Sequence, residues 1–108
     1  MQIRKFKIAL ILAIIFSGYL WAEGKYKMII DVRTQSEWDS GHIEKAVHLP
    51  LDSFESSIEL LVKDKEQRVY LYCRSGNRSG KALKIMQSLG YTNAFNAGGI
   101  NEAKESLK

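Results

Sequence analysis

One run of eight residues carries the side chains best suited to covalent chemistry. It reads Cys73-Arg74-Ser75-Gly76-Asn77-Arg78-Ser79-Gly80 and holds the only cysteine of the chain. Backbone N–H groups of a glycine-containing loop that opens a helix bind anions, and the helix dipole strengthens the binding. The same field favours a thiolate over a thiol. We therefore predict that Cys73 is a nucleophile and that an anionic substrate is bound by the loop residues Arg74, Ser75, Gly76, Asn77, Arg78 and Ser79.

The residues around this loop predict a strand before it and a helix after it. Residues 69–72 are apolar and β-prone, and the spacing of apolar residues predicts a helix over 81–89. Further strands are predicted at 27–30, 46–48 and 92–95, and helices at 35–40, from 52 or 53 to about 63, and after 99. Alternating strands and helices indicate an α/β fold, a three-layer arrangement of a central parallel sheet with helices on both faces. Ligands of such sheets lie at the carboxyl ends of the strands.

Local signals set the expected helix ends. Thr34 and Glu37 have the spacing of a capping box, and Gly41 stops the helix that they begin. Asp52 or Ser53 is the expected cap of the next helix. The side chains predicted to face inward from that helix are Phe54, Ile58, Leu61 and Val62.

The first 22 residues differ from the rest. A basic start precedes a wholly apolar run over 8–16, and small residues lead out of it to Ala22. This is the pattern of a secretory signal peptide, cleaved after Ala22, which leaves residues 23–108 as one domain. The apolar run, about 14 residues when extended to Trp21, is short for a membrane span of roughly 20. A retained anchor is the less favoured alternative, and we expect the mature form not to be embedded in a membrane.

Charge and cysteine content narrow the function. Three of the 16 Lys and Arg residues fall in the first 22 positions, so 13 remain against 12 Asp and Glu. A near-neutral domain gives no support for nucleic-acid binding. A single cysteine excludes an internal disulfide, and one cysteine with two scattered histidines offers no metal-ligand cluster. An unpaired thiol in an exported protein favours chemistry, while a small buried hydrophobic residue is the alternative. The polar neighbours of Cys73 argue against its burial.

Several further motifs stand in order around the cysteine loop. They are Asp31-Val32-Arg33, Glu37-Trp38, Gly41-His42-Ile43, Ala46-Val47-His48-Leu49-Pro50 and Asn96-Ala97-Gly98-Gly99. Together with the cysteine loop, they resemble the single-domain rhodaneses, which are thiosulfate sulfurtransferases, over about residues 28–105. Within the family, the export signal and short length are most similar to the periplasmic rhodaneses of bacterial phage-shock operons. Three departures are Lys45 in place of glycine, His48 in place of asparagine, and no tryptophan after Gly99.

The resemblance implies a reaction. Cys73 takes the outer sulfur of thiosulfate as a persulfide, and a thiol, or cyanide in the test tube, removes it. No metal or organic cofactor is implied, and we expect a monomer in the periplasm. The six residues from Cys73 to Arg78 match the loop of sulfurtransferases, whereas phosphatases and arsenate reductases of the same architecture have seven. A sulfur carrier or binding module that serves a protein acceptor remains the non-enzymatic alternative.

Other polar and aromatic residues receive structural interpretations. Asp31 and Arg33 are expected to pair at a strand end, and His42 to form a local hydrogen bond. Ser75 and Ser79 are interpreted as helix caps that can also donate to the sulfur. Trp38 and Phe54 are expected in the core, Tyr70 and Tyr72 on the sheet face opposite Val69 and Leu71, and Gly98-Gly99 in a turn.

Overall fold

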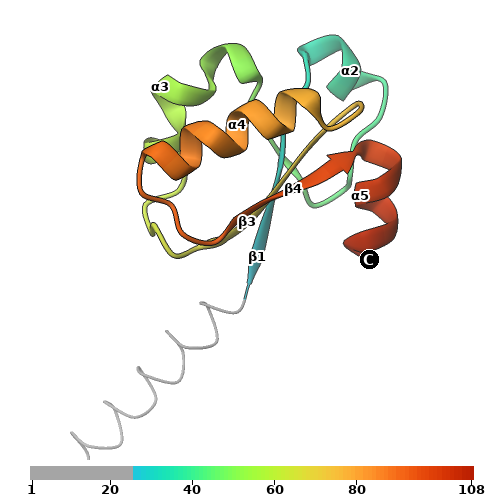
Figure 1. Cartoon of the computed structure of the whole chain (residues 1–108). Helices are drawn as coiled ribbons and strands as arrows, with labels where there is room; N and C mark the ends of the chain where they lie inside the picture. The colour runs from blue at the N-terminus through green and yellow to red at the C-terminus, as the bar shows by residue number, and fades with distance from the viewer. Residues whose placement is uncertain (1–25) are drawn as a thin grey trace, which may run out of the picture.

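The computed structural model describes residues 26–108, so the predicted signal peptide and its cleavage site lie outside the described residues. Strands and helices alternate along this part of the chain, as the sequence predicted (Figure 1). The elements are β1 (Lys27–Asp31), α2 (Gln35–Asp39), β2 (Val47–His48), α3 (Leu51–Leu61), β3 (Arg68–Cys73), α4 (Asn77–Ser88), β4 (Ala94–Gly99) and α5 (Ile100–Ser106).

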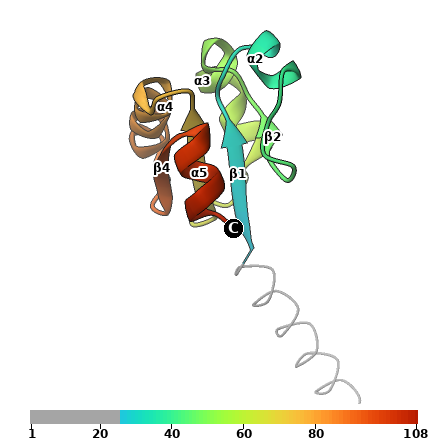
Figure 2. The ribbon, with the colours of Figure 1, turned by 90° about the vertical axis from the view of Figure 1, so that its right-hand side faces the viewer.

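The four strands form one parallel sheet in the order β2-β1-β3-β4. Ile30 of β1 pairs with Leu71 of β3 on one side and with Val47 of β2 on the other. Figure 2 shows β1 pointing toward α2, which lies beyond the carboxyl end of the strand. The α/β fold is confirmed, and the carboxyl edge of the sheet gathers the segments that follow β1, β2 and β3.

Helices α3 and α4 cover one face of the sheet. Strand residues pointing to this face alternate along β3, as expected for a period of two. The side chains between the helices and the sheet form a buried cluster, whose members are at most 9% exposed. This cluster comprises Ile30, Val32, Leu49, Phe54, Ile58, Val62, Val69, Leu71, Cys73, Ala82, Met86 and Tyr91.

Helix α5 covers the opposite face, where Ile29, Tyr72 and Ala103 form a smaller cluster. Tyr72 is fully buried, and its hydroxyl oxygen accepts a hydrogen bond from the Ile43 backbone N–H (3.1 Å). Burial raises the pKa of Tyr72 to about 12, so the phenol stays neutral. The prediction that Tyr72 faces away from Val69 and Leu71 is therefore confirmed.

The predicted cap of α3 is wrong. Pro50 precedes the helix, no side chain caps it, and Asp52 lies in its first turn. The chain enters α3 directly from β2, because the N–H of Leu49 donates to Asp31 O and that of Leu51 to Val32 O. These backbone bonds replace a side-chain cap. Phe54, Ile58 and Val62 face inward as predicted, but Leu61 is 36% exposed, a further correction.

Two other boundaries differ from prediction. Helix α4 begins at Asn77, four residues early, so Gly76 is its N-cap and neither Ser75 nor Ser79 has that role. Strand β4 occupies Ala94–Gly99 instead of 92–95, so the predicted turn at Gly98-Gly99 forms the end of a strand. Within residues 26–108 there is no helix with both the length and the apolar character required to cross a membrane.

Core packing by α3 leads to a stability prediction. Replacing Phe54, which is fully buried, with Ala should lower the free energy of unfolding by about 3–5 kcal/mol. Leu60 lies on the same helix and is 73% exposed, so Leu60→Ala should change it by less than about 0.5 kcal/mol. Urea unfolding of both variants measures the difference. Equal losses would contradict the orientation of α3.

Candidate active site

Cys73 is the last residue of β3 and is fully buried. This corrects the expectation that its polar neighbours keep it out of the core. Its side chain follows Val69 and Leu71 toward the face covered by α4, because alternate strand residues share one face. The polar residues Arg74 and Ser75 come after the strand has ended and are exposed. The Cys73 side chain can thus be buried although the residues that follow it are polar and exposed.

Two backbone N–H groups converge on the Cys73 sulfur. The N–H of Gly76 donates to Sγ at 3.0 Å and that of Ser79 at 3.5 Å. Gly76 has a φ of 99°, in the left-handed region that favours glycine, and this conformation turns its N–H back toward the strand. The first turn of α4 then presents Ser79 to the same atom. The predicted loop residues Gly76 and Ser79 therefore contact the Cys73 sulfur through their backbones.

The hydroxyl of Ser79 links Cys73 to β4. Its Oγ lies 3.4 Å from Sγ, and it donates to the side-chain oxygen of Asn96 at 2.7 Å. Asn96 Nδ2 also donates to the Gly76 carbonyl (3.0 Å), so one amide joins both sides of the loop. The Ser79 hydroxyl has a single proton, so it can donate to the sulfur of an ionised Cys73 only by giving up its bond to Asn96.

These contacts determine the protonation of Cys73. Burial raises the pKa of the thiol, but hydrogen bonds from the Ser79 hydroxyl and from the N–H groups of Ser79, Ser75 and Gly76 lower it further than burial raises it. The net pKa is lowered, because every one of these donors stabilises the charged form. The arrangement favours a thiolate without a neighbouring general base.

The two arginines of the loop have different surroundings. Arg78 is half-buried and forms a two-point ion pair with Glu37 of α2, Nη1–Oε1 at 2.7 Å and Nη2–Oε2 at 2.9 Å. This pairing is the main reason that the pKa of Glu37 falls to about 2. Arg74 is exposed, as are Ser75 and Asn77. A hollow of about 370 Å³ adjoins Arg78 and is lined mainly by residues that follow β1 and begin α3.

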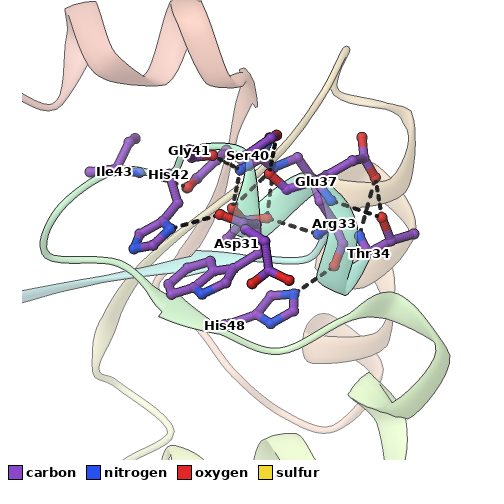
Figure 3. A network of polar contacts seen from close by, with 12 residues as sticks. Asp31, Arg33, Thr34, Glu37, Ser40, Gly41, His42, Ile43 and His48 are labelled. Atoms are coloured by element: carbon purple, nitrogen blue, oxygen red, sulfur yellow. Dashed lines mark hydrogen bonds and ion pairs between the residues drawn. The ribbon is translucent and has the colours of Figure 1, made fainter.

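A buried ion pair fixes the end of β1. Arg33 donates to both carboxylate oxygens of Asp31, with a shortest distance of 2.7 Å, and to the Gly41 carbonyl at 2.7 Å (Figure 3). The predicted structural pairing is confirmed. Asp31 is fully buried and Arg33 is 5% exposed. Because all of these partners belong to the protein, the pair holds the β1–α2 connection in place.

Two histidines flank Trp38 next to this pair. His42 stacks on the indole with a centroid distance of 3.4 Å, and its Nδ1 bonds to the Trp38 carbonyl (2.9 Å), which confirms the predicted local hydrogen bond. His48 also stacks on the indole, with a centroid distance of 4.7 Å, and its Nε2 bonds to the Arg33 carbonyl (2.7 Å). Trp38 is only half-buried and not in the core, which corrects that prediction.

The end of β4 packs directly against the backbone of the cysteine loop. Gly99 pairs with Cys73, and a Cβ atom placed on Gly99 would lie 2.4 Å from the Arg74 carbonyl oxygen. Gly98 has a φ of 84° and lies beneath Gly76. Glycine is needed at 99 because the two backbones meet there.

The structure brings part of the predicted site together and adds two residues to it. The sulfur of Cys73 contacts Gly76 and Ser79. It accepts no hydrogen bond from the side chain of Arg74, Ser75 or Asn77. The sequence interpretation missed Asn96 and Glu37 as partners of the loop. Asn96 stood in a matched motif without a role, and Glu37 had been explained fully by its capping box. Within residues 26–108, no three His, Cys, Asp or Glu side chains group closely enough to hold a metal ion.

Residues 19–106 match the rhodanese-like domain family. The chain is 36% identical over 86% of its length, and 86% of the relative, to "Thiosulfate sulfurtransferase PspE" of Escherichia coli. It resembles the solved structure "rhodanese with anions from E. coli", with a TM-score of 0.68 and 35% identity over 71% of this chain and 91% of that one. The human single-domain sulfurtransferase TSTD1 gives a TM-score of 0.63 and 30% identity over 81% and 88%.

The chain therefore belongs to the rhodanese-like family, as an enzyme of the sulfurtransferase class. A second type of relative is a much longer protein. The "tRNA uridine(34) hydroxylase" of Yersinia enterocolitica is 34% identical over 75% of this chain, but the matched region is only 25% of that protein. The family domain thus also occurs as a part of larger proteins.

Contact between Gly99 and the loop leads to a second prediction. Gly99→Ala should force the backbones apart and cost on the order of 1–3 kcal/mol of unfolding free energy. Gly80→Ala is the matched control, because its Cβ meets only Asn96 Nδ2 at an ordinary 3.4 Å and alanine favours the helix. Urea unfolding and the alkylation rate of Cys73 compare them. Equal behaviour of the two variants would contradict the close approach.

The contact of Ser79 with the sulfur leads to a third prediction. Wild-type Cys73 should keep its reactivity below the ordinary thiol pKa of about 8.5, because its own pKa is lowered. Ser79→Ala removes the hydroxyl and should raise the pKa. At a pH below the Cys73 pKa of both wild type and Ser79→Ala, the variant should be alkylated roughly tenfold more slowly. This factor corresponds to the loss of a hydrogen bond to a charged group worth about 1.5 kcal/mol. Rates with neutral iodoacetamide across pH test this.

Ser75→Ala is the control for that experiment. It retains the backbone N–H of residue 75, which contributes to the lowered pKa, and removes only an exposed hydroxyl. Its pH profile should match wild type. A profile for Ser79→Ala that also matches wild type would contradict the role of the Ser79 hydroxyl.

Proposed function

We propose that the enzyme transfers sulfane sulfur from thiosulfate to a thiophilic acceptor through a persulfide on Cys73. The observation that carries the proposal is the convergence of the Gly76 N–H, the Ser79 N–H and the Ser79 hydroxyl on Sγ. Such donors stabilise a sulfur anion as an oxyanion hole stabilises oxygen. The lowered pKa of Cys73 supports its use as a nucleophile.

The reaction has two displacement steps. In the first, the Cys73 thiolate attacks the outer sulfur of thiosulfate, a new S–S bond forms, and the old one breaks with its electron pair leaving on sulfite. In the second, an acceptor thiolate or cyanide attacks the terminal sulfur of the persulfide and regenerates the Cys73 thiolate. No proton transfer at Cys73 is needed in either step, which fits a thiolate held by hydrogen bonds. We propose that the reaction uses no cofactor.

We assign the remaining loop residues to substrate binding. Arg74 is exposed at the mouth of the loop and provides a positive charge that attracts the thiosulfate dianion. Ser75, Gly76 and Asn77 contribute backbone N–H groups at the start of α4. Arg78 contributes a guanidinium group whose charge Glu37 balances. Removing one backbone donor from the transition state would cost about 2.7–4 kcal/mol, on the scale known for oxyanion holes.

The cellular setting is proposed from the first 22 residues together with the relatives. The name of the Escherichia coli relative supports thiosulfate as the donor, and 86% coverage of both chains supports a similar overall organisation. We propose that residues 1–22 are a cleaved export signal, that residues 23–108 form the mature domain, and that it works in the periplasm as a monomer. A role in the phage-shock response belongs to the same proposal.

A sulfur-carrier role is the second candidate. The observation that favours it is the match to a quarter of the length of a tRNA uridine(34) hydroxylase, where the domain is joined to other parts. A carrier would form the same persulfide and pass its sulfur to a protein. Cyanide would then remove the sulfur slowly or not at all. The phosphatase or arsenate reductase interpretation is disfavoured by the six-residue loop.

The test compares residues 23–108 with the Cys73→Ser variant in a thiosulfate:cyanide assay. Wild type should produce thiocyanate, and its intact mass should increase by one sulfur atom after thiosulfate treatment, while Cys73→Ser should do neither. A sulfur adduct without turnover would support the carrier. Neither adduct nor turnover would overturn sulfur transfer, and hydrolysis of a phosphate ester would then be measured.

A further inference from the structure

The charges of the two loop arginines are not equally available. Arg78 uses both terminal nitrogens on the carboxylate of Glu37, at 2.7 and 2.9 Å, and the two side chains are 30% and 24% exposed. Among residues 26–108, this is the only ion pair that involves a residue of the cysteine loop. A pair with this two-point geometry is well defined and carries no net charge.

Arg78 belongs to the first turn of α4, the turn that contacts the Cys73 sulfur. It precedes Ser79, whose N–H and hydroxyl both contact the sulfur. The bond to Glu37 is the largest cause of the raised pKa of Arg78, and attraction to the Cys73 thiolate also contributes. We therefore expect the charges of Arg78 and Cys73 to attract each other, with Glu37 offsetting most of the Arg78 charge.

Other charged groups lie near the loop, but within residues 26–108 Glu37 is the one that forms an ion pair with Arg78. Asp52 lines the same hollow as Arg78 without an ion pair to it. Asp31 and Arg33 cancel each other in a buried pair, and Glu102 of α5 accepts from the Gly99 N–H. Arg74 is exposed within the loop and keeps its positive charge whatever the state of Arg78, so it adds a constant attraction that salt weakens. The net charge of the Arg78–Glu37 pair therefore determines how positive the mouth of the site becomes.

We propose that Glu37 is a specificity-determining residue that limits the affinity of the Cys73 site for oxyanions by neutralising Arg78. The proposal rests on the proposed function in one respect, the identity of the donor. Thiosulfate enters as a dianion, and sulfite leaves as an anion. A site in which Arg78 had no carboxylate partner would hold thiosulfate, sulfite and sulfate more tightly. A site in which Glu37 neutralises Arg78 releases sulfite and excludes sulfate.

The substitution Glu37→Gln changes this charge with little change of shape. Glu37 also accepts hydrogen bonds from the Thr34 N–H (3.1 Å) and hydroxyl (2.9 Å) in the capping box of α2. Glutamine serves equally well at that position of a capping box, and its oxygen can still accept from Arg78. Helix α2 is therefore retained while the negative charge is removed.

Four proteins form a series in the net charge of this pair. Glu37→Gln leaves a positive charge, wild type and the double variant Glu37→Gln/Arg78→Gln are neutral, and Arg78→Gln leaves a negative charge. We expect affinity for sulfate, measured as protection of Cys73 from iodoacetamide, to be highest in Glu37→Gln and lowest in Arg78→Gln. Each charge step should change it by about two- to fivefold, the range for partly exposed charges.

The thiol pKa and the sulfur-transfer kinetics should follow the same order. Glu37→Gln should lower the pKa of Cys73 and the KM for thiosulfate, Arg78→Gln should raise both, and the double variant should resemble wild type. High ionic strength should reduce the spread. A double variant that is worse than both single variants would show a structural role and overturn the proposal, as would unchanged sulfate protection in Glu37→Gln.

Failure of the proposed function remains distinguishable from failure of this inference. Alkylation rates and sulfate protection require only the thiol and an anion, so they report the charge series even if wild type transfers no sulfur. If thiosulfate yields no persulfide while the charge series holds, the donor is wrong and Glu37 retains its role. If the persulfide forms and the series is absent, the inference on Glu37 is wrong and sulfur transfer stands.

Discussion

The site depends on one side-chain amide that fixes the shape of the loop. Asn96 donates to the Gly76 carbonyl, and its oxygen accepts from the Ser79 hydroxyl and the Gly98 N–H. Gly76 and Ser79 are the residues whose N–H groups reach the sulfur. A single residue of β4 thus spaces the donors that act on a residue of β3. The neighbouring contact of Gly99 with Arg74 closes the loop from the same strand.

Two ion pairs at the carboxyl edge serve different purposes. Asp31 and Arg33 lie within two residues of each other and are buried, so their pairing fixes the route of the chain as it leaves β1. Glu37 and Arg78 come from α2 and α4 and remain partly exposed. Burial makes the first pair a rigid support. Partial exposure leaves the second pair in contact with solvent, as the proposed role of Glu37 in anion binding requires.

The sequence predicted the order of strands and helices and the position of Cys73 at the carboxyl edge of the sheet, because each depends on local pattern. Val69, Leu71 and Tyr72 could be assigned to opposite faces from their alternation alone. The cap of α3 could not be predicted, since the backbone of Val32, just after β1 and distant in sequence, takes the place of a capping side chain. Likewise, Asn96 and Glu37 meet the cysteine loop only through tertiary packing, across 20 and 41 positions.

The stacking of Trp38 with two histidines makes the segment that follows β1 observable by tryptophan fluorescence. The chain has two tryptophans, Trp21 and Trp38, so removal of residues 1–22 would leave one indole. That indole lies in α2 next to Glu37 and stacks with the rings of both His42 and His48. Its emission depends on how closely the imidazoles approach it, and hence on the integrity of the segment from Arg33 to His48. Fluorescence thus gives this protein an intrinsic probe of the region that holds the end of β1, without any label attached.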